Sequence, residues 1–245
     1  GTGAFVNANV LNATYNPSAS DILNGSVTLT LTVTSAAGCV DATDSMILTI
    51  SQQATVNAGV DATICETGTY TLSTATAADY TSLAWTTSGD GSFSNIATLN
   101  PIYTPGLNDI SLGTVTLTLT VQSATACSPA SDDMVLTISE QATANAGVDA
   151  TICEGSSYTL TTASATNAAT YTWSTSGTGA FVNANVLNAT YNPSAADILN
   201  GSVTLTLTVT SAAGCVDATD SMILTISQQA TVNAGVDATI CETST

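Results

Sequence analysis

The chain contains a long internal copy of itself, and this repetition constrains the fold more than any other feature. Residues 1–69 recur as residues 177–245, an offset of 176 positions. Only two positions differ between the copies: Ser20 is aligned with Ala196, and Gly68 with Ser244. Repetition on this scale is typical of a linear array of similar domains.

Half of that offset is a second period. The phrase NAGVDATICE recurs every 88 positions, with its cysteine at Cys65, Cys153 and Cys241. The sequence between the copies is related but diverged, so two repeat types, A and B, alternate. We assign residues 1–51 to the C-terminal part of a type A repeat, 52–139 to a complete type B repeat, 140–227 to a complete type A repeat, and 228–245 to the N-terminal start of another type B repeat. We expect further chain or a neighbouring molecule to complete the two partial repeats.

The charge composition excludes several classes of function. The chain has no Lys, Arg or His but 18 Asp and Glu residues, giving a formal net charge of −18. Histidine is the usual general base for Ser and Cys nucleophiles, so we predict that the protein is not an enzyme. Binding to nucleic acids and to anionic lipids depends on cations, so we expect neither partner. No unbroken apolar stretch is long enough for a transmembrane helix, so we expect no membrane insertion.

Alternating apolar residues predict β-strands. In Val27–Val33, apolar residues alternate with threonines, and the pattern returns at 115–121 and 203–209. A period of two gives a strand one buried and one exposed face. Further short strands are expected at residues 46–50, 70–72, 83–85, 158–160 and 171–173, separated by Gly- and Asn-rich turns. No segment shows helical periodicity, so the sequence predicts all-β, tandem Ig-like β-sandwich domains in a linear array.

The six cysteines allow two pairing patterns. Successive spacings alternate between a short one, as from Cys39 to Cys65, and a long one, as from Cys65 to Cys127. Pairing at the short spacing joins successive domains and requires the chain to double back. Pairing at the long spacing stays within one domain, brackets its Trp and closes a loop worth about 4 kcal/mol. We favour the second pattern over the first and over six reduced thiols. It predicts Cys65–Cys127 and Cys153–Cys215, with Cys39 and Cys241 paired outside residues 1–245.

Four strings carry a family resemblance: ANAGVDATICEGSSYTL, YTWSTSGTG, SVTLTLTVTSAAGC and DSMILTIS. They resemble the PKD-like, Ig-like repeats of giant secreted surface proteins of Bacteroidota, and the resemblance extends over the whole chain. It implies tandem β-sandwiches with one disulfide per repeat. It also implies export by the type IX secretion system and a role as an adhesin, a surface filament or a stalk for an enzyme.

Some acidic residues persist in both repeat types. Asp44 opens a predicted strand and Asp61 lies at a domain entrance, so the two could share a Ca²⁺ ion with backbone carbonyls. The alternative is that these carboxylates cap turns through backbone hydrogen bonds. No other cofactor is expected. The candidate calcium ligands are Asp44, Asp61, Asp132, Asp149, Asp220 and Asp237.

A possible modification site lies beside one of these acids. Ser45 and Ser221 each follow Asp and precede Met, which resembles the Asp-Ser/Thr-hydrophobic O-glycosylation signal of Bacteroidota. The type B repeat has Asp133 at this position, so only type A repeats could carry the glycan. A chance match to so short a motif is the alternative.

These features together predict a structural protein. Our main hypothesis is a disulfide-stapled, non-catalytic repeat region of an extracellular filament or adhesin stalk, located at the cell surface or secreted. Its partners would be neighbouring repeats of the same polymer or like chains, and surface polysaccharide. The alternative is a set of polysaccharide-binding modules that tether a large secreted enzyme, which requires exposed aromatic side chains. We expect Trp85 and Trp173 to be buried instead.

Overall fold

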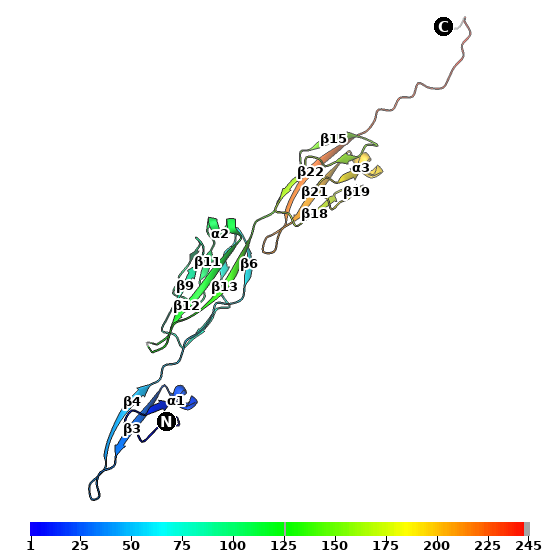
Figure 1. The fold of residues 1–245 in the computed structure, drawn as a ribbon. Coiled ribbons are helices and arrows are strands. Elements are labelled where there is room, and N and C mark those ends of the chain that lie inside the picture. Colours follow the sequence, from blue (N-terminus) through cyan, green and yellow to red (C-terminus); the bar gives the residue numbers. More distant parts are fainter. Residues whose placement is uncertain (125, 243–245) are drawn as a thin grey trace. The chain divides into compact units, whose positions relative to one another are not determined.

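The computed structural model describes residues 1–124 and 126–242, and residues 243–245 of the last predicted repeat lie outside this range. The chain divides into two compact units, Gly1–Ile138 and Ser139–Thr245, and each is described by itself (Figure 1). Strands dominate both units, with three short helices among the described residues. No helix in the described part of the chain is long and apolar enough to cross a membrane.

The strands from β5 to β13 form a β-sandwich. A four-stranded sheet has the order β6-β13-β12-β9; a three-stranded sheet, β10-β11-β7, and the pair β5-β8 complete the domain (Figure 1). The elements are β5 (Thr55–Asn57), β6 (Ala62–Cys65), β7 (Tyr70–Thr71), β8 (Thr76–Ala78), β9 (Ser82–Thr87), β10 (Ser92–Phe93), β11 (Ile102–Thr104), α2 (Leu107–Leu112), β12 (Thr114–Gln122) and β13 (Ala130–Ser139).

The same architecture recurs in the next repeat. The four-stranded sheet has the order β15-β22-β21-β18, with β16-β20-β19 and β14-β17 as its companions. Strand β15 runs parallel to β22, whereas β21 runs antiparallel to both of its neighbours. The elements are β14 (Thr143–Asn145), β15 (Ala150–Cys153), β16 (Tyr158–Thr159), β17 (Ser164–Thr166), β18 (Thr170–Thr175), β19 (Ala180–Val182), β20 (Thr190–Asn192), α3 (Ala195–Asn200), β21 (Ser202–Thr210) and β22 (Ala218–Ser227). The predicted all-β, tandem Ig-like fold is confirmed.

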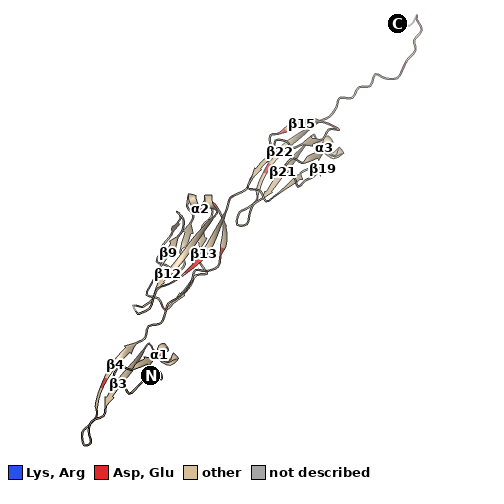
Figure 2. Ribbon diagram, viewed as in Figure 1, with Lys and Arg blue, Asp and Glu red and all other residues tan. Residues whose placement is uncertain are grey.

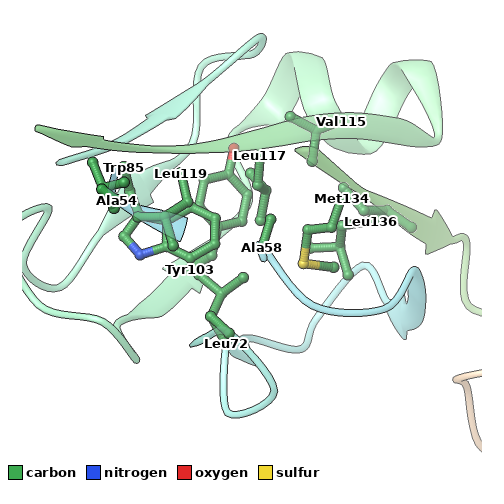
Figure 3. Close-up of a cluster of buried hydrophobic side chains, with 13 residues drawn as sticks. Ala54, Ala58, Leu72, Trp85, Tyr103, Val115, Leu117, Leu119, Met134 and Leu136 are labelled. Atoms are coloured by element: carbon green, nitrogen blue, oxygen red, sulfur yellow. The ribbon is translucent and has the colours of Figure 1, made fainter. Parts of the chain in front are cut away.

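The alternating strands build the core. In β12, the apolar residues Val115, Leu117, Leu119 and Val121 are at most 3% exposed, while the intervening threonines face outward. Figure 3 shows the core of this repeat, in which Trp85 from β9 and Tyr103 from β11 lie beside Leu117 and Leu119. Since these residues come from both sheets, the alternating pattern directs the two apolar faces into one core.

The structure also contains short helices that the sequence pattern did not predict: α1 (Ala19–Asn24), α2 and α3. Ser194 begins α3 as its N-cap and accepts a hydrogen bond from the Asp197 amide, and the Asp197 carboxylate accepts one from the Ser194 amide in return. Gly201 ends α3 with a positive φ of 76°. So short a helix cannot show a 3.6-residue apolar period. The Ser-x-x-Asp capping box and the following Gly were the available signal.

The two repeat types cap this helix differently. In type A, the Thr178 and Ser194 hydroxyls are hydrogen-bonded at 2.6 Å. In type B, Asp90 replaces the threonine, and its carboxylate accepts the amides of Asn108 and Asp109. Gly106 replaces the serine, because a Cβ there would lie 2.1 Å from Asp90 Oδ1. The substitutions at these two positions therefore compensate for each other.

Residues 1–51 form only part of a sandwich. They contain β1 (Ala4–Val6), β2 (Thr14–Asn16), α1, β3 (Ser26–Val33) and β4 (Ala42–Thr49). Met46 is 57% exposed, whereas its equivalent in the complete repeat, Met222, is 1% exposed. An open groove of about 550 Å³ includes Phe5 and Leu11, whose equivalents lie around Trp173 in the complete repeat. Covering such apolar side chains is worth about 1.5–3 kcal/mol each, so this part of the chain is not a stable sandwich by itself.

The compensating caps make a quantitative prediction. We expect Gly106→Ser alone to destabilise the type B repeat by about 1–3 kcal/mol, since the new side chain collides with Asp90. Adding Asp90→Thr recreates the type A pair, and we expect it to recover most of that loss. Denaturant unfolding in a Trp173→Phe background reports on Trp85 in this repeat. A double-mutant cycle with no coupling energy would contradict this interpretation.

Candidate functional site

A buried carboxylate organises one end of each sandwich. Asp197, on α3, is fully buried and accepts hydrogen bonds from four donors. The donors are the amides of Thr178, Gly179 and Ser194, each at 2.9 Å, and the Tyr191 hydroxyl at 2.7 Å. One side chain thereby joins the helix, strand β20 and the turn before β19.

Two turn glycines allow this close approach. A Cβ on Gly177 would lie 2.2 Å from Asp197 Oδ1, and one on Gly179 would lie 2.5 Å from the Asn192 carbonyl. The Gly-x-Gly phrase therefore brings backbone amides to the carboxylate. We call this arrangement the Asp–Tyr clasp, and it is repeated at Asp21 with Tyr15 and at Asp109 with Tyr103.

The clasp holds its carboxylate ionised. Burial alone would raise the pKa of Asp197, but hydrogen bonds from Ser194, Thr178 and Tyr191 outweigh it and lower the pKa to about 2. Burial likewise opposes ionisation of Asp109, and similar hydrogen bonds outweigh it and lower the pKa of that carboxyl. Burial and the bond to Asp109 raise the pKa of Tyr103 to about 12. Over the neutral range the clasp is a carboxylate paired with a protonated phenol, so neither group is available as an acid or base.

The predicted calcium ligands hold strands together. In the complete type A repeat, Asp220 accepts the Ala146 amide at 2.7 Å and Asp149 accepts the Ile223 amide at 2.8 Å. The type B repeat repeats this reciprocal pair through Asp132 with the Ala58 amide and Asp61 with the Val135 amide, each at 2.8 Å. These bonds attach the N-terminal segment of each domain to the edge of its four-stranded sheet.

The structure does not bring a cation site together. Across residues 1–124 and 126–242, no group of three or more His, Cys, Asp or Glu side chains could hold a metal ion. Asp44 accepts the amide of the next residue, Ser45, at 2.9 Å, and Asp237 lies in an exposed segment. Five of the six predicted ligands, all except Asp237, therefore accept backbone amides in the structure. Calcium binding with carbonyl ligands stays a prediction.

The predicted glycosylation serines lie on the outer face of the four-stranded sheet. Ser221 on β22 is exposed, and its hydroxyl is hydrogen-bonded to that of Thr206 on β21 at 2.8 Å. Ser45 makes the equivalent contact with Thr30 at 2.9 Å. An attached glycan would project from a row of threonines, and this modification stays a prediction.

The tryptophans are core residues. Trp85 is 1% exposed and Trp173 is 3% exposed. Each indole N–H donates to a backbone carbonyl, that of Leu99 for Trp85 and that of Leu187 for Trp173. Neither ring is available to stack on a sugar. The polysaccharide-binding alternative would therefore need aromatic side chains other than these two tryptophans.

The cysteines occupy two kinds of position. The recurring phrase ATIC forms the whole of β6 and of β15, so Cys65 and Cys153 are the last residues of these strands. We call them, together with Cys241 at the same place in the third copy of the phrase, the strand-end cysteines. The hairpin-loop cysteines, Cys39, Cys127 and Cys215, lie between the two long strands of each hairpin, β3–β4, β12–β13 and β21–β22. Cys65 and Cys215 are disulfide-bonded, while Cys39, Cys127 and Cys153 have free thiols.

The predicted pairs Cys65–Cys127 and Cys153–Cys215 are therefore wrong. Cys153 lies opposite Ser227, the last residue of β22, whereas Cys215 precedes Ala218, the first residue of that strand. A strand of this length spans about 30 Å. A disulfide requires Cα atoms within about 7 Å. The long cysteine spacing thus joins opposite ends of one strand, and the short-spaced pair Cys39–Cys65 is excluded by the free thiol at Cys39.

Comparisons with known proteins identify multidomain chains. No protein-family model matches the sequence, and no curated protein is similar to it. A titin I-band fragment, I67–I69, aligns at 15% identity with a TM-score of 0.49, over 94% of this chain and 83% of the fragment. Protocadherin Gamma C5 EC1-3 aligns at 12% identity with a TM-score of 0.45, over 88% of this chain and 82% of that one.

The clasp makes a prediction about stability and pH. All four partners of the Asp197 carboxylate are N–H or O–H donors. In Asp197→Asn, the NH₂ group of the new side chain would face one or more of these donors and could not accept their hydrogen bonds. We expect a loss of about 3 kcal/mol in the type A repeat. Because the folded-state pKa of Asp197 lies at about 2, below its ordinary value, the clasp contributes fully above about pH 4. Its contribution is lost as the pH falls through about 2.

Denaturant unfolding in a Trp85→Phe background, followed through Trp173, measures this loss. The matched control is Asp237→Asn, which removes a charge from an exposed position. Equal stability of the Asp197→Asn and control variants would rule out the clasp as a stabilising element.

A second prediction concerns calcium. Four of the predicted calcium ligands already accept backbone amides, so we expect them to bind Ca²⁺ weakly. They are Asp61, Asp132, Asp149 and Asp220. Thermal unfolding in EGTA and then in millimolar Ca²⁺ should differ by less than about 10 °C, since a larger shift requires tight binding to the folded state. A larger shift that disappears in Asp149→Asn would establish a calcium site.

Proposed function

We propose that this chain is a non-catalytic structural region of an extracellular filament or adhesin stalk. The observation that carries the proposal is that one β-sandwich recurs at a fixed period and uses its carboxylates to bind its own backbone. Asp149, Asp197 and Asp220 all accept main-chain amides within the same domain. Among the described residues, no buried side-chain nitrogen or oxygen lacks a hydrogen-bond partner, which favours a scaffold over a reactive site.

The charge distribution supports a stalk. Figure 2 shows acidic residues spread along the domains with no basic residue to oppose them. Charges of one sign repel over a Debye length of about 8 Å at physiological ionic strength. Repulsion between like chains keeps them soluble and disfavours unspecific lateral aggregation. The partners proposed for such a region are neighbouring repeats of the same polymer or like chains, and surface polysaccharide.

Disulfide chemistry supports an extracellular location. Cys65 and Cys215 are disulfide-bonded, and disulfides persist mainly in oxidising compartments. The resemblance of the repeats to those of secreted Bacteroidota surface proteins favours the same location and export by the type IX system. We therefore place the chain at the cell surface or in secreted material.

Immunogold electron microscopy tests this function. Antibodies raised against residues 52–227 should label fibres on intact cells that produce the protein. Endoproteinase Glu-C added to these cells should remove the label, whereas trypsin should not, because the chain has no Lys or Arg. Label confined to the cell interior, or to a soluble secreted enzyme, would contradict the proposal.

A binding assay separates the stalk from the polysaccharide tether. We expect the purified chain to remain in solution when mixed with insoluble polysaccharides. Tyr80 is 40% exposed, so its aromatic ring is the candidate for stacking on a sugar, and the exposed aliphatic residue Ile96 serves as the control. Retention that is lost in Tyr80→Ala but kept in Ile96→Ala would support a carbohydrate-binding module instead.

A further inference from the structure

We propose that this chain joins a second copy of itself by strand addition, with residues 228–242 of one copy lying along the open edge of β4 in the other. The added segment takes the place that β14 and β15 hold in the complete type A repeat. This inference deepens the proposed function and rests on it, because it names the surface through which like chains join.

The acceptor is an open sheet edge. Among the described residues, β4 pairs only with β3, whereas its equivalent in the complete repeat, β22, also pairs with β15 on its other side. An unpaired edge presents a row of free N–H and C=O groups, and it is a template for another strand. Addition of an extended segment to such an edge is a general mode of protein recognition.

The donor is an extended segment with the matching sequence. Residues 228–242 follow β22 and form no strand or helix (Figure 1). The apolar side chains of Val232, Val236 and Ile240 are each at least 76% exposed. The same residues in the same order occupy positions 52–66, where they form β5 and β6. The segment is therefore able to form strands, although no sheet in the described part of the chain includes it.

The complete type A repeat shows how donor and acceptor fit together. The sequence of β22 is identical to that of β4 and the two residues after it. The segment that covers the edge of β22, residues 140–154, differs from residues 228–242 at two positions only, where it has Glu for Gln228 and Ala for Val232. Since the same two sequences already form a sheet within one domain, their register applies to the joined copies.

That register defines two hydrogen bonds between the copies. In the complete repeat, a carboxylate on β22 accepts an amide of the covering segment, and a carboxylate of the covering segment accepts an amide of β22. In the joined copies, the Asp44 carboxylate accepts the Ala234 amide, and the Asp237 carboxylate accepts the Ile47 amide. Hydrogen bonds to a charged acceptor are stronger than neutral ones, so this reciprocal pair fixes the register of the added strand.

The added segment also fills apolar sites. In the complete repeat, Ala142 and Ala146 are buried, and Ile152 packs against the core. Their removal from water favours the paired state. The corresponding donor residues are Ala230, Ala234 and Ile240.

The contact has a direction. The donor segment and the acceptor edge are different surfaces, so a joined pair still has one unused donor and one unused acceptor. Contacts of this head-to-tail kind continue into open chains or close into rings. Strand addition therefore extends an assembly of like chains without a separate linking protein.

Sedimentation of the full chain tests the association. In a reducing buffer, which prevents disulfides between copies, we expect the average mass to rise with protein concentration. It should also rise with added salt, because salt screens the repulsion between copies that each carry a net charge of −18. A wild-type chain that stays monomeric at every concentration and ionic strength would overturn this inference. The stalk itself is decided by the labelling of intact cells.

A donor variant and its control locate the contact. We expect Ile240→Asp to weaken association at least about tenfold, because it places a charge where the equivalent Ile152 packs against the core. Val236→Asp adds the same charge and should retain association, because its equivalent Val148 is 71% exposed in the complete repeat. Equal association of the two variants would show that another surface joins the copies.

An acceptor variant makes the test directional. Ile47→Pro removes the amide offered to the added strand, and the equivalent amide of Ile223 bonds to Asp149 rather than to β21. Ile47→Pro and Ile240→Asp chains should each be monomeric alone and should form a mixed dimer when combined, since each supplies the surface that the other lacks. Because Ile47→Pro contributes only its donor segment to this dimer, damage to its β4 leaves the mixing test intact. Absence of the mixed dimer would contradict strand addition.

Hydrogen exchange separates a second copy from the chain's own segment. In wild type, protection of the β4 amides should increase with protein concentration, and the increase should be absent in Ile240→Asp. Protection that does not depend on concentration but is lost in Ile240→Asp would show that residues 228–242 fold back onto their own chain. That result would overturn the inference.

Discussion

The buried Asp–Tyr clasp is the interaction on which each sandwich depends. Asp197 has no cation to neutralise it, so its charge is balanced by three backbone amides and the Tyr191 hydroxyl. Those donors come from a turn, a helix start and a strand that are separate in sequence. A buried carboxylate without these bonds would be costly, so burying it selects the one arrangement that supplies all four. The Gly-x-Gly turn, the start of the short helix and the tyrosine together supply these four donors.

The same rule governs the other acidic residues. A chain without Lys, Arg or His cannot form side-chain ion pairs, so its carboxylates are solvated, accept hydrogen bonds from neutral donors or bind a metal ion. Asp149 and Asp220 accept amides across the sheet edge, and Asp90 accepts the amides that begin α2. Hydrogen bonds from backbone amides to a charged acceptor are stronger than neutral ones. The acidic composition is therefore compatible with a rigid fold.

The sequence predicted the strands because their signal is local. Alternation from Val203 to Val209 alone determines which side chains enter the core. The helix at Ala195–Asn200 was missed because so short a helix cannot show a helical period, although its capping box was readable. The disulfide pairing failed for a different reason: spacing along the chain does not reveal at which end of a strand a loop lies. That end depends on the parallel pairing of β15 with β22, a non-local feature.

This parallel pairing separates the two cysteines of a repeat. If the ATIC strand ran antiparallel to β22, its cysteine would lie near the hairpin loop, and each repeat could close its own disulfide. Parallel pairing instead sends Cys153 to the end of β22 where the chain leaves the domain, and Cys215 stays at the opposite end of that strand. The two cysteines of one repeat therefore cannot bond to each other.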